Sequence, residues 1–211
     1  MIRIRWHGHS CFEFSDGITL VIDPHDGASI GIAPPKVKAD VILVTHDHFD
    51  HNQTRVVEKE GSIVVRESKR IEGIKIEAIK AYHDKEKGSK RGEINMYKVN
   101  YDIISFLHVG DLGHMLDDET IKRIGKIDML FVPVGGVFTI DAGEAYELSK
   151  KIDAKIIVPM HYKIEGLSLP IDRLEKFIEV SKDIPVRYVA NEIEIEKEDI
   201  PKEKEMWVFS L

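Results

Sequence analysis

The stretch Thr45-His46-Asp47-His48-Phe49-Asp50-His51 directly follows the apolar run Val41-Ile42-Leu43-Val44. An apolar run bounded by turn-forming residues is typical of a buried strand, so we expect the stretch to lie on the loop that leaves the strand end. Sheets of α/β proteins usually place their functional sites on such loops. Three imidazoles and two carboxylates lie within six consecutive residues, and these are groups that bind divalent zinc, manganese or iron. The sequence therefore predicts a metal site in an α/β protein.

The spacing inside this stretch predicts how the ligands divide between ions. His46 and His48 are two residues apart in an extended segment and can converge on one ion. Asp50 and His51 follow where the chain turns into a helix, and they indicate a second ion beside the first. The alternative is a solvated, polar strand-to-helix loop, which is the usual place of a single histidine. Three histidines and an aspartate at this spacing favour the metal site.

Length and charge restrict the class of protein. A chain of 211 residues with 43% apolar residues suits one soluble globular domain spanning residues 1–211. No apolar run approaches the length of a membrane span, and the alternating residues 1–6 are typical of a strand and not of a signal peptide. We therefore expect no membrane partner. The net charge of −7 argues against a nucleic-acid partner, which would need a positive surface.

Residue usage indicates the compartment and the source. Cys11 is the only cysteine, so the chain can form no intramolecular disulfide, and a reducing, cytoplasmic compartment is expected. Its place in a strand-like run favours a small core residue over a nucleophile. Gln53 is the only glutamine, while Ile, Lys and Glu are frequent. This balance is typical of hyperthermophile proteins and favours a thermophilic source.

Strand-like and helix-like segments alternate along the chain. The opening strands, residues 2–6, 11–14 and 19–22, are expected to form an antiparallel meander with a hairpin turn at Asp16-Gly17. Further strands are predicted at residues 62–66, 73–80, 95–99, 103–108, 129–133 and 155–159, and short strands near the C-terminus. Helices are predicted at residues 52–60, after Asp117, from Asp141 to about residue 151, and at residues 171–182. The alternation supports an α/β layered fold in one domain.

The pattern His46-x-His48-x-Asp50-His51 after an apolar strand resembles the signature of the metallo-β-lactamase superfamily, whose other ligand positions follow in order. The resemblance implies a first ion bound by His46, His48 and His83, and a second bound by Asp50, His51 and His161. It implies that Asp111 bridges the two ions. It also implies that Asp23 sits beneath the metal loop and orients its histidines. The ions would be zinc, with manganese as the other candidate.

Further motifs narrow the resemblance within the superfamily. These are Gly8-His9-Ser10-Cys11, Asp23-Pro24, Gly110-Asp111, Gly135-Gly136-Val137-Phe138-Thr139 and Pro159-Met160-His161-Tyr162. They resemble small metal-dependent hydrolases related to L-ascorbate-6-phosphate lactonase. The resemblance implies a four-layer αββα sandwich with the metals at one edge. The chain lacks the extra helical domain of glyoxalase II and the inserted domain of RNA-processing nucleases. It also lacks the glutamate that oxygen-reducing di-iron relatives carry in place of His48, which favours hydrolysis over redox chemistry.

Candidate substrate contacts follow from neighbouring motifs. The resemblance puts His9 near the pocket. The backbone N–H groups of Gly135 and Gly136 suit an oxyanion or phosphate, although the pair is equally typical of a tight turn. His108 and His114 either line the pocket or satisfy backbone groups.

The segment at residues 85–92 carries a net positive charge. It is either a solvated surface loop or a device that recruits an anionic substrate, since it follows His83 directly on an otherwise acidic chain.

The leading functional hypothesis is a metal-dependent hydrolase with a dinuclear site that activates water against a small anionic ester, lactone or phosphodiester. Asp50 and Asp111 are the expected catalytic carboxylates because they place the ions, and Asp47 or a neighbouring histidine would move the proton. One alternative is a phosphodiesterase acting on RNA or nucleotides, which the acidic balance and the missing insert disfavour. Another is a metal-stabilised protein that binds a small ligand without turnover. A homo-oligomer is possible under each hypothesis.

Overall fold

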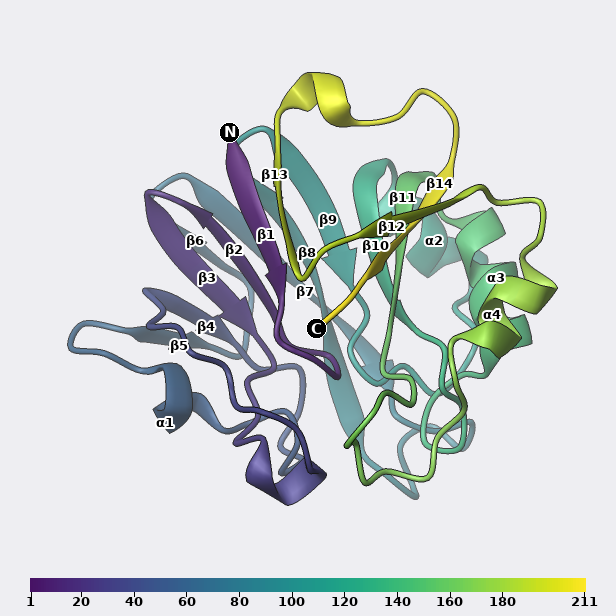
Figure 1. The fold of residues 1–211 in the computed structure, drawn as a ribbon, viewed down its shortest axis with the longest axis horizontal. Helices are drawn as coiled ribbons and strands as arrows, with labels where there is room; N and C mark the ends of the chain where they lie inside the picture. The colour runs from purple at the N-terminus through teal and green to yellow at the C-terminus, as the bar shows by residue number, and fades with distance from the viewer.

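A computed structural model describes all residues, 1–211, and contains two β-sheets packed face to face (Figure 1). The first sheet has the strand order β13-β1-β2-β3-β4-β5. Its strands are β1 (Ile2–Trp6), β2 (Phe12–Asp16), β3 (Ile18–Ile22), β4 (Val41–Leu43), β5 (Ile63–Val65) and β13 (Glu192–Ile195). The antiparallel meander of β1, β2 and β3 confirms the predicted opening of the chain.

The second sheet has eight strands in the order β12-β14-β11-β10-β9-β8-β7-β6. They are β6 (Lys69–Ile71), β7 (Ile74–Tyr82), β8 (Glu93–Tyr101), β9 (Ile104–His108), β10 (Ile127–Pro133), β11 (Ala154–Met160), β12 (Val186–Val189) and β14 (Glu205–Phe209). The helices are α1 (Thr54–Val57), α2 (Asp118–Ile124), α3 (Ala142–Lys151) and α4 (Glu175–Val180). In Figure 1, α1 lies outside the first sheet, and α2, α3 and α4 lie outside the second. The helices and sheets form the αββα sandwich that the family resemblance implied.

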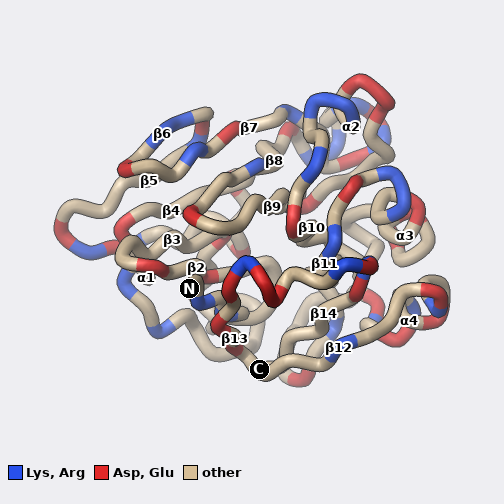
Figure 2. Tube along the Cα trace, turned by 90° about the horizontal axis from the view of Figure 1, so that it is seen from above, with Lys and Arg blue, Asp and Glu red and all other residues tan.

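Aromatic side chains fill the space between the two sheets. Phe14 of β2 stacks on Phe106 of β9 with 4.1 Å between ring centroids, and Phe12 packs edge-on against Phe131 of β10 at 4.6 Å. Both contacts join the two sheets, since alternate residues of a strand point to the same face. Charged residues occur along the helices and loops, whereas the central strands carry few (Figure 2). This large apolar core fixes the sheets relative to each other and therefore fixes where their strand ends lie.

Strand direction brings several loops to one edge of the sandwich. In the second sheet, β7 and β9 both run antiparallel to β8, and β9, β10 and β11 run parallel, so β7, β9 and β11 share one direction. In the first sheet, β3 and β4 run parallel. The carboxyl ends of parallel strands meet at the same sheet edge, and the loops with the candidate ligands leave from these ends.

Two predicted helices are shorter in the structure than in the sequence prediction. The helix expected at residues 52–60 is the four-residue α1, in which the β-branched Val56 and Val57 are weak helix formers. The helix expected at residues 171–182 begins only at Glu175. The preceding Asp172 instead exchanges backbone hydrogen bonds with Gly135 and Lys163, which hold it outside the helix. None of the helices combines the length and the apolar character needed to cross a membrane.

One strand was not predicted. β6 pairs with β7 through a tight turn at Glu72-Gly73, whose φ angles of 44° and 90° are both positive. Two positive φ values match the twist that a two-residue hairpin requires.

Candidate metal centre

The predicted ligands lie together at the edge where the strands end. His46, His48, Asp50 and His51 follow β4, His83 follows β7, Asp111 follows β9 and His161 follows β11. One group comprises His46, His48 and His83, whose ligand atoms all lie within 4.8 Å of one another. A second comprises Asp50, His51 and His161, with His9 as a fourth member. The structure thus brings together both predicted ligand sets and places His9 beside the second.

Asp111 lies between the two groups. Its Oδ2 is 3.2 Å from Nε2 of His83 in the first group and 3.2 Å from Nε2 of His161 in the second. Its Oδ1 is 3.2 Å from Nε2 of His51. The side chain is buried, with 2% of the residue exposed. A carboxylate in this place can contact ions held by either group.

Asp23 and Thr45 hold two of the histidines from behind. Asp23 accepts the Thr45 N–H at 2.8 Å and the Thr45 hydroxyl at 2.7 Å. Because the Thr45 hydroxyl donates to Asp23, its Oγ1 accepts a hydrogen bond from the Nδ1–H of His46 at 2.9 Å. Nδ1 of His51 likewise donates to Asp23 at 2.9 Å. These bonds direct Nε2 of both imidazoles toward the centre, as expected for Asp23.

Buried polar atoms without hydrogen-bond partners converge on the same place. Nε2 of His46, Nε2 of His51 and Oδ1 of Asp111 are all buried and none forms a hydrogen bond of acceptable geometry. Most buried polar atoms in folded proteins have a partner, so three orphans facing one another require an explanation. Imidazole nitrogen and carboxylate oxygen are zinc and manganese ligands, and divalent cations would satisfy all three. The residues fit the predicted metals.

The electrostatics of the site favour the ligand forms of most groups. Burial lowers the pKa of His46 to about 3, so this imidazole is neutral at pH 7. Burial alone would raise the pKa of Asp50, but the charge and hydrogen bond of His51 outweigh burial and lower it. The pKa of Asp111 is lowered in the same way, by His161 and His51. Metal binding requires neutral imidazoles and ionised carboxylates, which is the state of these three groups.

The pKa of His51 shifts in the opposite direction to that of His46. Burial would lower its pKa, but the carboxylates of Asp111, Asp50 and Asp23 surround the ring and raise its pKa well above 6.5. Without a cation in the site, the proton on His51 is the positive charge that these carboxylates share. A divalent ion would displace that proton.

His9 supports a ligand and does not line the pocket. It is fully buried with a left-handed backbone (φ 53°), and burial lowers its pKa to about 3. The neutral ring donates from Nε2 to Oδ2 of Asp50 at 3.0 Å, and its centroid lies 4.2 Å from that of His161. The resemblance put His9 near the pocket as a candidate substrate contact, whereas the structure places it behind two predicted metal ligands.

The remaining predicted contacts also lie outside the pocket. A Cβ on Gly135 would lie 2.2 Å from the His161 carbonyl oxygen, so this glycine allows close packing beneath His161. Gly136 takes a left-handed φ of 60°, as a tight turn requires. His108 is fully buried, with Nε2 on the Ser10 carbonyl at 2.9 Å and Nδ1 accepting the Gly110 N–H. His114 accepts the Tyr82 N–H. The sequence left two roles open for His108 and His114. In the structure, both residues form hydrogen bonds with backbone groups.

A pocket of about 460 Å³ opens over the metal centre. It is lined by Asp47, His48, Phe49, Asp50, His83, Arg91, Asp111, Phe138, His161 and Leu169. Sequence reasoning did not single out Phe49, Phe138 or Leu169 as pocket residues. For Phe49, the available sequence signal was its place inside the metal loop. In the structure this large apolar residue is 52% exposed. Leu169 carried no local signal because it reaches the pocket only through the fold.

The segment at residues 85–92 is a turn organised by Asp84. The Asp84 carboxylate accepts the backbone N–H groups of Glu86, Gly88, Lys90 and Arg91. Lys85 pairs with Glu144 and Lys90 pairs with Glu86. Only Arg91 of the basic residues in this segment lines the pocket, and its guanidinium lies 4.7 Å from the ring centroid of Phe138. The predicted recruitment of an anion thus rests on one residue and not on the segment as a whole.

Comparison with known proteins identifies the family. Residues 3–161 match the sequence profile of the β-lactamase superfamily domain. A UPF0173 metal-dependent hydrolase of Nitratidesulfovibrio vulgaris is 31% identical over 193 residues, which are 76% of this chain and 80% of the relative. A UPF0173 metal-dependent hydrolase of Thermoplasma acidophilum is 28% identical over 186 residues, 76% of this chain and 83% of the relative.

A solved structure from Thermotoga maritima extends the likeness to the whole fold. That protein, described as a Zn-dependent hydrolase of the metallo-β-lactamase superfamily, is 31% identical to this chain. The match covers 99% of this chain and 98% of the other, with a TM-score of 0.80. Sequence profile, relatives and fold agree with one another, and the chain belongs to the metallo-β-lactamase superfamily.

Proposed function

We propose that this chain is a metal-dependent hydrolase with a dinuclear site that acts on a small anionic ester, lactone or phosphodiester. The single observation that carries the proposal is the position of Asp111, whose two oxygens lie 3.2 Å from histidines of both ligand groups. His46, His48 and His83 would hold one ion, and Asp50, His51 and His161 the other. The names of the relatives as metal-dependent hydrolases, and of the Thermotoga maritima protein as Zn-dependent, support hydrolysis and favour zinc over manganese.

Divalent ions in such a site supply an acidified water and polarise the oxygen of the scissile bond. The chain's own residues supply the geometry. Asp23 and Thr45 fix the ring orientation of His51 and His46, and His9 fixes one oxygen of Asp50. The remaining carboxylate at the mouth is Asp47, which lines the pocket and pairs with Arg66 at 2.8 Å. As an exposed carboxylate beside the site, Asp47 is placed to pass a proton to solvent.

The test begins with the metal-free protein, reloaded with zinc or with manganese. Each form is assayed against a panel of lactones, small phosphodiesters, RNA, carboxylic esters and thioesters, with Asp111→Asn as the matched inactive variant. Turnover that requires two ions per chain and disappears in Asp111→Asn supports the proposal. Two bound ions without turnover of any class would favour the ligand-binding alternative, and turnover confined to RNA would favour the phosphodiesterase. Ascorbate-6-phosphate lactone belongs in the panel because of the motif resemblance.

The cytoplasmic location, the absence of membrane and nucleic-acid partners and the homo-oligomer stay predictions. The buried free thiol of Cys11 is compatible with a reducing compartment.

A further inference from the structure

The pocket over the metal centre has a chemically divided wall. Its floor consists of candidate ligands, and three apolar side chains, Phe49, Phe138 and Leu169, form part of its wall. Arg91 is the only lysine or arginine that lines it. A pocket of this composition suits a ligand with an apolar part and a separate negative charge.

Arg91 is held in place but has no carboxylate partner. Its backbone N–H donates to Asp84 at 2.7 Å, directly beside the candidate ligand His83, and its guanidinium packs over the ring of Phe138. No aspartate or glutamate oxygen lies within ion-pair distance of its guanidinium, whereas the nearby Arg66 pairs with Asp47 at 2.8 Å. The planar fork of a guanidinium binds carboxylate and phosphate oxygens in pairs. Arg91 therefore offers its donors to a ligand.

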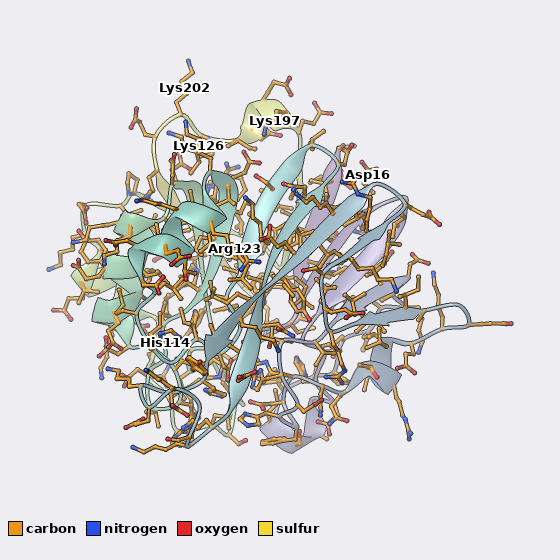
Figure 3. The ribbon with its side chains drawn as sticks, turned by 180° about the vertical axis from the view of Figure 1, so that it is seen from behind. Asp16, His114, Arg123, Lys126, Lys197 and Lys202 are labelled. Atoms are coloured by element: carbon orange, nitrogen blue, oxygen red, sulfur yellow. The ribbon has the colours of Figure 1, made fainter.

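Arg91 also lies where the pocket meets a second, polar groove. This groove shares Asp47, His48 and Arg91 with the pocket and continues to Lys80 and Glu93. Lys80 lies 3.7 Å from Glu93, so its charge is also partnered. In Figure 3, Lys126, Lys197 and Lys202 lie near the top of the molecule, whereas His114, which follows Asp111 in the chain, lies in the lower half. Among the basic residues that border the pocket or the groove, Arg91 alone lacks an acidic partner.

The apolar wall is built on a small core of its own. Phe138 and Leu169 pack against the buried side chains of Ile30, Leu167 and Ile171, which form a cluster separate from the main core. Phe49, by contrast, stands half exposed on the metal loop. One side of the pocket is thus fixed by packing. The ring of Phe49 is exposed to solvent and is an apolar surface that a bound ring would cover.

We propose that Arg91 is a specificity-determining residue, and that the substrate is an ester or lactone that joins an apolar body to a second group, a carboxylate or phosphate, bound by this guanidinium. The inference rests on the proposed hydrolase function, because the scissile group is taken to lie at the metal centre. Phe138 positions Arg91 and contacts the apolar body, and Asp84 fixes the loop that carries Arg91. The second anionic group, and not the group that is cleaved, then distinguishes this substrate from simple esters.

The test uses two matched probes that bind metal through the same headgroup. Benzohydroxamate chelates divalent ions and presents a neutral ring, while 3- and 4-carboxybenzohydroxamate add a carboxylate to that ring. Binding to the zinc-loaded full chain is measured by calorimetry. We expect the better carboxylated probe to bind about 10-fold more tightly than benzohydroxamate, as a charge-assisted contact at a partly exposed site would give. The preference should disappear in Arg91→Gln and persist in part in Arg91→Lys.

Lys87→Gln is the matched control, because it removes the same charge from the same loop at an exposed position outside the pocket. It should leave the preference intact, and Phe138→Leu should weaken both probes. Equal affinity of the wild-type chain for both probes, or a preference unchanged in Arg91→Gln, would overturn the anion subsite and leave the metal centre standing. A zinc-treated wild-type chain that binds neither probe would contradict the metal centre itself.

Discussion

Nδ1 of His51 lies 2.9 Å from Oδ2 of Asp23, and both side chains are fully buried. Asp23 leaves the end of β3, in the first sheet next to β4, with a left-handed backbone (φ 48°), so the carboxylate lies beneath the loop that carries His51. The bond fixes which nitrogen faces Asp111 and, once the ring is neutral, keeps the proton of His51 on Nδ1. The orientation of one predicted ligand is therefore decided by a residue outside the predicted ligand set.

Asp23→Asn should weaken metal binding without removing a ligand. An amide has only one acceptor oxygen and cannot accept from Thr45 and His51 as the carboxylate does. We expect a loss of about 10- to 100-fold in affinity for the ion at Asp50, His51 and His161, measured by competition with a chelator. Asp26→Asn, in a turn away from the centre, is the control. Unchanged affinity would show that Asp23 does not orient the site.

His161→Ala should reduce the number of bound ions from two to one. The variant removes a nitrogen from the second group and leaves the first group of three histidines intact. Metal content after dialysis, measured by mass spectrometry, gives the result directly. His114→Ala should retain both ions, because its ring bonds to backbone groups. Retention of both ions in His161→Ala would remove His161 from the ligand set.

Asp111→Asn should abolish turnover while the chain still folds. The amide keeps the shape of the side chain but loses the charge that faces both histidine groups. Placing the two ions contributes several kcal/mol to catalysis, so we expect a fall in kcat of about 100-fold or more. Circular dichroism and chemical unfolding of the variant check the fold. Wild-type kcat with both ions bound would refute the bridging role.

In the metal-free chain at pH 7, the ring of His51 should be protonated on both nitrogens and positively charged, whereas the ring of His46 should be neutral. The pKa of His51 is raised by three carboxylates, and that of His46 is lowered to about 3 by burial. Nitrogen chemical shifts of the imidazole rings distinguish the two states, and adding zinc should convert His51 to its neutral form. A neutral His51 in the metal-free chain would contradict the assignment.

The same two shifts act on stability with opposite sign. Because the pKa of His51 is raised, its contribution to the free energy of unfolding is present in full below pH 6.5. This contribution is lost as the pH rises through the raised pKa. Because the pKa of His46 is lowered, its contribution to the free energy of unfolding is present above pH 6.5. This contribution is lost as the pH falls toward 3. Thermal unfolding of the metal-free chain across pH 6 to 9 should show the His51 effect, and zinc should suppress it.

The sequence alone determined the layered fold and the residues that could bind metal. Apolar runs such as Val41 to Val44 are local signals, because a strand buried on both faces must be apolar throughout. The histidines and aspartates of residues 46–51 could likewise be recognised as candidate metal ligands, because the ability to bind a metal depends on the side-chain type. Their order along the chain matched the superfamily, and the fold carries them to one sheet edge.

Only the tertiary structure decided what the other polar residues do. His108 meets the Ser10 carbonyl across 98 positions of sequence, and His9 meets Asp50 across 41. No local pattern reveals such contacts, so the sequence left the role of His108 open and the resemblance put His9 near the pocket. In the sequence, Arg91 is one of several basic residues in its segment. Only the structure shows that the turn around Asp84 and the ring of Phe138 hold it at the pocket. A side chain's chemistry is written in the sequence, but its partners are set by packing between distant segments.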